Sequence, residues 1–304
     1  MYRYFLQGLR VGVISNLFLL WASLTFVNIS NDLFLVVPAL ILISVSAFRC
    51  LFPVNYASKS VIIDSILSSV FVTRFLVTIV EVTYIYMFSY VLRIINSDQH
   101  LFVDLISWIM VIQVIISQFF CWGAILLKYE RFYFYEEFGW FVIFFINTIL
   151  SIIMLSLDVS NAHHSLIIIN IVFGTLYLPW QVLHLRSITQ RINSNPDIKS
   201  QELKFNIANI KLELKKSIHD RKLSYESNDW GGTVGMMWMY GYWILFIPVW
   251  MFYIILIIWL KDSRQRYPNF ILICMNWMIC IKLQYRSVKV FRNTKFKIIA
   301  VTSN

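Results

Sequence analysis

The chain has 304 residues, of which 59% are hydrophobic and 17% aromatic, while only 14% are charged. A soluble domain has about 25% charged residues, so this composition excludes an ordinary soluble protein and indicates an integral membrane protein. The net charge is +10, and basic loops facing anionic lipid headgroups explain it without nucleic acid as a partner.

Apolar segments of membrane-spanning length recur along the whole chain. A helix needs about 20 apolar residues to cross the hydrocarbon core of a bilayer. The sequence therefore predicts an all-α fold, a polytopic transmembrane helix bundle in which residues 1–304 form a single membrane domain. The eight predicted spans are 11–28, 33–52, 66–92, 101–127, 137–157, 165–184, 236–260 and 268–284.

The distribution of basic residues predicts the orientation of these spans. If the N-terminus is cytoplasmic, most of the 26 Lys and Arg residues fall on the cytoplasmic side of the eight spans. Short cytoplasmic loops are enriched in Lys and Arg, so we expect both termini in the cytoplasm. The first span continues to Val27 without a cleavage site after it, so we expect it to stay in the mature chain.

The third predicted span contains two charged residues, Arg74 and Glu81, with Asp64 upstream. A charge at the centre of a bilayer costs roughly 3 kcal/mol, so such a residue is a functional-site hypothesis. Arg74, Thr78 and Glu81 share one helix face, but Arg74 and Glu81 are two turns apart, about 10 Å. We therefore expect each charge to find partners on other helices, deep in the membrane. The alternative is a structural polar clamp that fixes the register of the bundle.

Polar residues also recur in the fourth and fifth spans. Gln113, Ser117 and Cys121 follow one another at every fourth residue, which predicts a polar stripe facing the same cavity. Hydrogen bonding between two packed helices explains this stripe equally well. Glu136 and Glu137 begin the fifth span, where the helix dipole favours acidic residues. One of them could face inward, or both could be solvated at the interface.

Metal chemistry has little support in the sequence. Glu81, Glu136 and His184 are a conceivable ligand set, because bundled helices can supply such ligands. The chain lacks both a Glu-x-x-His and a His-x-x-x-His pair, so we expect no metal site, and no particular cofactor is indicated.

The long loop from 186 to 232 contains one stripe of apolar residues at helical spacing. It predicts an amphipathic cytoplasmic helix between spans six and seven, with basic residues facing anionic lipid headgroups. A helix packed on the underside of the bundle is the alternative. The stripe consists of Leu203, Ile207, Ile210, Leu214 and Ile218.

Several motifs resemble those of a functionally uncharacterised family of polytopic membrane proteins from bacteria and algae. The residues Phe48–Pro53 fit F-R-x-x-x-P, Asp64–Val70 fit D-S-x-L-S-S-V, and Arg74–Glu81 fit the R...T..E pattern. In that family the end of the pattern is A-T-x-A-E, and here Val77 and Val80 stand in place of its two alanines. The larger valine side chains affect how closely the helices can pack there. The resemblance implies no reaction, but it implies a shared set of residues: Asp64, Ser65, Arg74, Glu81, Glu136 and Glu137.

Three functions are compatible with these features. The first is binding or transport of a small solute, ion or proton, with Glu81 as the binding carboxylate and Arg74 as its counter-charge or as an anion anchor. The second is a membrane-embedded enzyme acting on a lipid or other hydrophobic substrate, with Glu81 or Glu136 as general base. The third is a structural subunit of a homo-oligomer or larger membrane complex. The candidate binding residues are Asp64, Arg74, Thr78, Glu81, Gln113, Ser117, Glu136 and Glu137.

Overall fold

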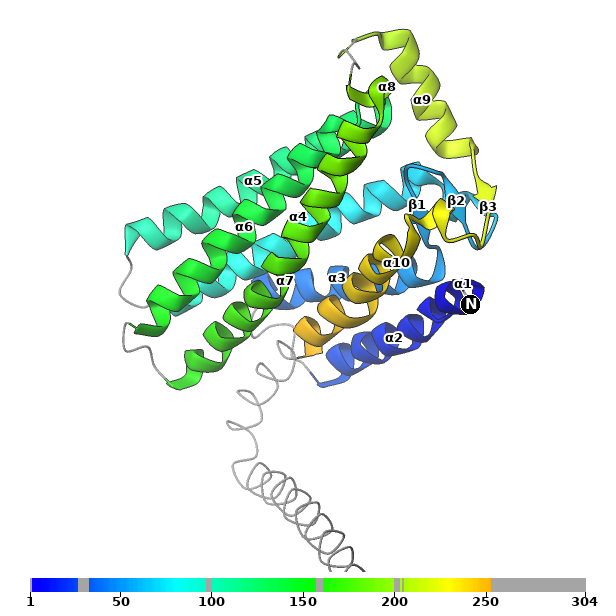
Figure 1. The fold of residues 1–304 in the computed structure, drawn as a ribbon. Helices are drawn as coiled ribbons and strands as arrows, with labels where there is room; N and C mark the ends of the chain where they lie inside the picture. Colours follow the sequence, from blue (N-terminus) through cyan, green and yellow to red (C-terminus); the bar gives the residue numbers. More distant parts are fainter. Residues whose placement is uncertain are drawn as a thin grey trace, which may run out of the picture.

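The structure, a computed structural model, describes residues 2–26, 33–96, 100–156, 161–199, 203 and 205–252 (Figure 1). Seven helices in this part are long and apolar enough to cross a membrane. The predicted all-α class is confirmed, and the protein has the helices of a multi-pass membrane protein. The predicted span 268–284 and the end of the span 236–260 lie outside the described residues.

The helices follow one another with short connections. An N-terminal pair of spans, Leu9–Phe26 and Leu33–Leu51, is followed by four long helices. Short helices at one end of the bundle come next, and the last helix continues through a π-helical turn. In chain order they are α1 (Tyr2–Gln7), α2 (Leu9–Phe26), α3 (Leu33–Leu51), η2 (Ile66–Ser68), α4 (Val70–Ile95), α5 (Leu101–Leu127), α6 (Arg131–Ser156), α7 (Asn161–Ser194), α8 (Pro196–Lys199), α9 (Ile207–His219), η3 (Asn228–Trp230), α10 (Gly232–Tyr240) and η4 (Gly241–Phe246).

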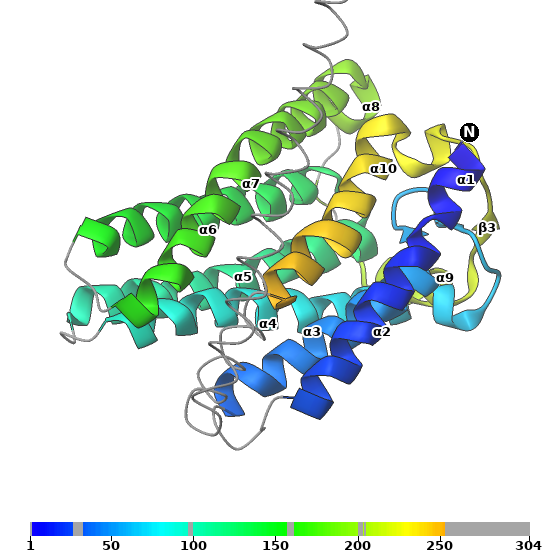
Figure 2. The same ribbon diagram turned by 90° about the horizontal axis from the view of Figure 1, so that it is seen from below.

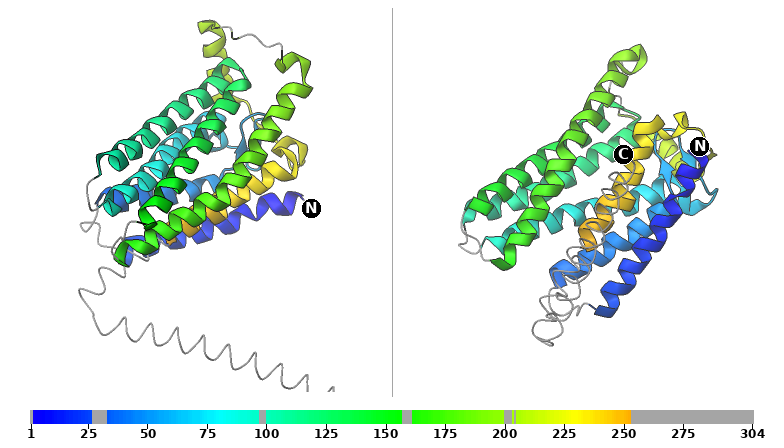
Figure 3. Two further views of the ribbon diagram at one scale, coloured as in Figure 1. Left: turned by 60° about the vertical axis from the view of Figure 1, so that its left-hand side comes forward. Right: turned by 60° about the horizontal axis from the view of Figure 1, so that its bottom comes forward.

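Consecutive long helices are neighbours, as short connections require. Contacts run from α2 to α3 and then through α4, α5, α6 and α7. Figures 2 and 3 show α10 lying between α2 and α7, where it closes the bundle. Its continuation η4 contacts both α2 and α3. The last described helix therefore joins the N-terminal pair to the four long helices.

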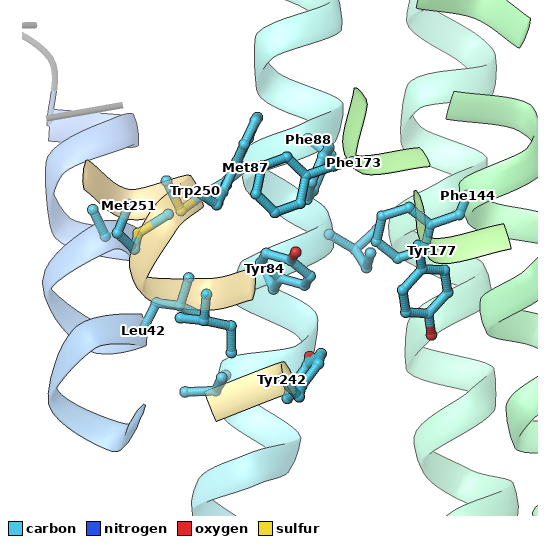
Figure 4. Close-up of a cluster of buried hydrophobic side chains, with 14 of the residues drawn as sticks. Leu42, Tyr84, Met87, Phe88, Phe144, Phe173, Tyr177, Tyr242, Trp250 and Met251 are labelled. Carbon is cyan, nitrogen blue, oxygen red and sulfur yellow. The ribbon is translucent and has the colours of Figure 1, made fainter. Parts of the chain in front are cut away.

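An aromatic layer fills the centre of the bundle (Figure 4). Phe88 of α4 stacks on Trp250 at 4.2 Å between ring centroids, and Phe144 of α6 lies 4.1 Å from Tyr177 of α7. Tyr84 contacts Phe88 edge to face. These rings join α4, α6, α7 and the last helix, and such aromatic pairs add about 1 kcal/mol each to the burial of apolar surface.

The outer faces of α2 and α5 are apolar and exposed. Ile14 and Phe18 of α2 and Ile112 and Phe119 of α5 are between 55% and 73% exposed. A soluble protein rarely exposes such continuous apolar surface, whereas helices that face hydrocarbon require it. These faces fit contact with lipid.

A small three-stranded sheet, which the sequence did not predict, covers one end of the bundle. β1 (Val54–Asn55) pairs antiparallel with β2 (Ser60–Val61), and β2 pairs parallel with β3 (Lys222–Leu223). The turn between β1 and β2 places Lys59 at a positive φ of 55°. The sheet joins the connection after α3 to the long segment before α10, although these are far apart in the sequence.

The start of α4 differs from the predicted boundary of the third span. The Ser69 hydroxyl caps the helix by accepting from the amide of Val72, so α4 begins at Val70 and not at residue 66. Arg74 consequently lies about 6 Å along the axis from the first residue of α4. The charged residue therefore lies nearer the end of the bundle than the predicted span implied, and this is the end that carries the sheet.

The predicted loop 186–232 is largely structured. Helix α7 continues to Ser194, and α9 forms within the loop and packs against α4 and α5. On α9 the side chains of Glu213 and Ser217 are buried, while Ile207 is 63% exposed. The buried face is thus rotated away from part of the predicted apolar stripe, in the manner of a helix packed on the end of the bundle. Contact of α9 with lipid headgroups stays a prediction.

Candidate functional site: a charged pocket at the capped end

A pocket of about 300 Å³ lies at the end of the bundle that the sheet covers, which we call the capped end. Its walls come from the five helices α3 to α7, from the β1 region, and from η3 and α10 with η4. A π-helical turn such as η4 is often found at functional sites, and here it places Tyr242 and Trp243 on the pocket wall. The charged lining residues are Arg49, Arg74, Glu81, Glu136, Glu137, His184 and Arg191.

Arg74 is the centre of the buried charge cluster. Its Nη2 lies 2.9 Å from Glu81 Oε2 and 3.1 Å from Glu136 Oε1, and it donates to Gln118 Oε1 at 2.5 Å. The side chains of Arg74 and Glu136 are 3% and 6% exposed. With both carboxylates ionised, the cluster has one negative charge in excess, so it could take up a proton or a cation.

The partners of Arg74 fit the sequence prediction in part. Glu136 on α6 and Gln118 on α5 are the expected partners from other helices. The direct contact with Glu81 was not expected, because the two residues are two turns apart on α4. The long arginine side chain bridges this distance along the helix and places its guanidinium beside both carboxylates.

The two consecutive glutamates of α6 have different partners, and both line the pocket. Glu136 pairs with Arg74, whereas Glu137 accepts from Gln181 Nε2 at 2.7 Å and lies 3.3 Å from His184 Nε2. Neighbouring residues on a helix point in directions about 100° apart, which allows this division. His184 therefore pairs with Glu137 and not with Glu81 or Glu136, the other two residues of the conceivable metal-ligand set.

Four of the predicted binding residues do not line the pocket. Thr78 accepts a hydrogen bond from Trp122 Nε1 at 3.0 Å, between α4 and α5. Asp64 has a 67% exposed side chain and pairs with Arg221 at 2.8 Å, outside the bundle. The remaining two, Gln113 and Ser117, face α6.

Gln113 and Ser117 contact α6 at a glycine. A Cβ atom at Gly139 would come too close to Ser117 Oγ and would lie 2.7 Å from Gln113 Nε2. The polar stripe of α5 thus allows close approach of two helices, which is the helix-packing alternative that the sequence left open. Gln118, one residue further along α5, is the side chain that reaches the charge cluster.

Arg49 lines the pocket, although it was not among the binding residues predicted from the sequence. It is 5% exposed, and its guanidinium lies between two rings, 5.4 Å from the Tyr56 centroid and 5.3 Å from that of Trp243. Nη2 donates to the carbonyl of Val54 at 3.4 Å, while Nε and Nη1 are buried without a hydrogen-bond partner among the described residues. The F-R-x-x-x-P motif was the one sequence signal that included it.

Tyr56 connects the two arginines. Its ring lies 5.4 Å from the guanidinium carbon of Arg49 and 5.7 Å from that of Arg74. Its hydroxyl is buried and has no partner among the described residues. Burial raises the pKa of this hydroxyl above its usual value of 10, and the positive charges of Arg49 and Arg74 lower it less. Tyr56 is therefore a hydrogen-bond donor at neutral pH.

No protein-family model matches the chain, and no curated protein or solved structure is detectably similar to it. The resemblance of residues 48–81 to an uncharacterised family thus stays a prediction. Within the described ranges, no group of three or more His, Cys, Asp or Glu residues is arranged to hold a metal ion.

Proposed function

We propose that this membrane protein binds a small solute, ion or proton in the pocket at the capped end and moves it across the bilayer. One observation carries the proposal: Glu81, Glu136 and Glu137, from two helices, all line the pocket, and Arg74 pairs with the first two of them. Buried charges in membrane proteins are costly and commonly mark substrate or ion pathways. The pocket volume is near the lower limit for small-ligand sites, about 300 Å³.

The aromatic layer next to the pocket supports a gated route. Tyr177 and Tyr242 belong both to the pocket lining and to the aromatic cluster of Figure 4. Beyond them Tyr84, Phe88 and Phe144 are buried and packed together. A solute in the pocket would meet this layer, so transport requires the rings to separate. The described conformation fits a state that is open at the capped end.

The orientation follows from the charge distribution as part of the same proposal. Eight spans with both termini cytoplasmic would place the capped end, and the pocket, on the cytoplasmic side. The exposed residues Lys211 and Lys215 of α9 would then face the anionic inner leaflet. The existence of a pocket also favours a binding function over a purely structural subunit.

Proton flux into liposomes tests the proposal directly. The purified protein is reconstituted with a pH-sensitive dye inside, and a pH gradient is applied under a clamped membrane potential. We expect flux above that of empty liposomes, and a fall of at least about tenfold in Glu81→Gln, because an amide cannot exchange a proton at neutral pH.

Asp64→Asn is the matched control, since it removes a carboxylate that is exposed and lies outside the pocket. Its flux should equal that of the wild type. Equal flux in Glu81→Gln and wild type removes Glu81 from the mechanism. Wild-type flux no greater than that of empty liposomes contradicts proton transport.

A further inference from the structure

The unpartnered polar atoms of the pocket are unusual in their chemistry. Among the described residues that line it, the buried side-chain atoms without a hydrogen-bond partner are Arg49 Nε, Arg49 Nη1, Arg74 Nε, Tyr56 Oη, Tyr242 Oη and His184 Nδ1. The arginine nitrogens can only donate, and the hydroxyl groups and the imidazole can donate as well. The pocket therefore has unused donors, and a ligand that satisfies them must supply acceptors.

The charges of the pocket separate Arg49 from the other cations. Arg74 has two carboxylates, Glu81 and Glu136, within 3.1 Å. Arg191 pairs with Glu130 at 3.2 Å, and His184 with Glu137 at 3.3 Å. No ion pair joins Arg49 to a carboxylate anywhere in the part of the chain that the structure describes. A buried guanidinium without a counter-ion is a costly arrangement.

The cation–π contacts of Arg49 do not use its N–H groups, and Nε and Nη1 are buried without a hydrogen-bond partner among the described residues. Tyr56 and Trp243 lie near the guanidinium at 5.4 and 5.3 Å, and such cation–π contacts compensate only part of the cost of burial. The N–H groups lie in the plane of the guanidinium, in a fork that matches the oxygens of a carboxylate or phosphate. The buried hydroxyl of Tyr56 adds a neutral donor beside this fork.

We propose that Arg49, with Tyr56, binds an oxyanion, a phosphate or carboxylate group, on the ligand of this pocket. This inference rests on the proposed binding function but does not require transport. The carboxylates of Glu81 and Glu136 lie against Arg74, and neither forms an ion pair with Arg49. The oxyanion can belong to a free solute or to an anionic lipid headgroup.

Tryptophan fluorescence provides the test, because Trp230, Trp238 and Trp243 line the pocket. The full-length protein in maltoside micelles is titrated with sodium phosphate against sodium chloride at constant ionic strength. In a second arm the micelles contain increasing amounts of phosphatidylglycerol and no phosphate. A saturable change in the first arm alone identifies a free oxyanion, and one in the second arm alone identifies a lipid headgroup.

The variants decide whether Arg49 is responsible. In Arg49→Gln the apparent dissociation constant should rise at least about tenfold in the responding arm, the loss expected for a charge-assisted hydrogen bond. Arg49→Lys keeps the charge without the fork and should fall between Arg49→Gln and the wild type. Arg93→Gln is the matched control, since this arginine also stacks on aromatic rings but lies near the opposite end of α4.

Each outcome has a definite meaning. An Arg49-dependent response supports the inference even if the liposomes show no flux, in which case only transport fails. A response that persists unchanged in Arg49→Gln overturns it. So does the lack of a response in both arms, and proton flux that depends on Glu81 would then still support the proposed function.

Discussion

Removal of Arg74 alone should destabilise the protein more than removal of the whole charge cluster. In Arg74→Met the carboxylates of Glu81 and Glu136 lose the cation with which they pair at 2.9 and 3.1 Å. Breaking a buried ion pair by removing one partner typically costs about 3–5 kcal/mol, because an uncompensated charge stays buried. We therefore expect Arg74→Met to lower the free energy of unfolding by about that amount at neutral pH.

The triple variant Arg74→Met, Glu81→Leu and Glu136→Leu should recover much of this loss. It leaves no charge unpaired, and apolar residues of similar volume often replace a buried ion pair without loss of stability. Gln118 Oε1 loses its donor in this variant, which costs about 1–3 kcal/mol for an unsatisfied buried acceptor. The free energy of unfolding of the triple variant should thus lie within about 3 kcal/mol of that of the wild type. It should be higher than that of Arg74→Met.

Unfolding in mixed micelles with increasing dodecyl sulfate measures these differences. Arg93→Met is the control, because Arg93 lies near the other end of α4, stacks on Trp108 at 4.2 Å and donates to the hydroxyls of Ser89 and Ser107, but forms no ion pair among the described residues. Arg93→Met should cost about 1–3 kcal/mol, because it loses a cation–π contact and two hydrogen bonds but leaves no buried charge unpaired. A loss of less than about 1 kcal/mol in Arg74→Met, or a triple variant no more stable than Arg74→Met, would refute this account.

Two further predictions concern packing and pH. Gly139→Ala should lower the free energy of unfolding by about 1–3 kcal/mol, because the new Cβ meets Ser117 Oγ, and Ser117→Ala should partly restore it in the same micelle assay. Burial raises the pKa of Glu213, but the hydrogen bonds from Lys216 and Lys128 lower it by more than burial raises it. The pKa of Glu213 therefore lies below its usual 4.5. The stabilisation is therefore present above pH 4.5 and lost as the pH falls through the folded-state pKa. Wild type should exceed Glu213→Gln by about 1 kcal/mol at pH 6, and this gap should narrow as the pH falls below 4.5. A gap that does not narrow contradicts the ion pairs.

The transmembrane helices could be predicted because their signal is local. A run of about 20 apolar residues must form a helix in lipid, where no other conformation satisfies its backbone. The helix ends were harder to place. Ile66 and Leu67 extend the apolar run toward the N-terminus, but the Ser69 hydroxyl caps the amide of Val72 and fixes the start of α4. Three serines, Ser65, Ser68 and Ser69, precede α4, and the sequence alone does not reveal which of them caps the helix.

The sheet could not be predicted because its strands are too short to carry a pattern. Each strand has two residues, and the alternation typical of a strand needs about four. The pairing of Ser60 with Lys222 joins segments that lie far apart in the sequence. The same limit applies to the site, where the rotation of each helix decides which polar residue meets Arg74. Gln118, and not Ser117, is the residue on α5 that does so.

The cost of burying a charge explains both the success and the failure of the site prediction. Arg74 and Glu81 stood out because they interrupt an apolar span, and the structure pairs them with each other and with Glu136. Arg49 ends a span, where a basic residue is ordinary, yet it is the arginine of the pocket whose Nε and Nη1 have no partner in the described protein.

Conspicuous charges in a membrane sequence are therefore the ones that the fold has most need to neutralise internally. Arg74 holds two carboxylates in place, which leaves little of its charge for a ligand. A residue that binds a ligand must instead keep donors unused in the free protein, as Arg49 does between Tyr56 and Trp243. Arg74 thus shapes the wall of the pocket, and Arg49 is the cation still able to select what enters it.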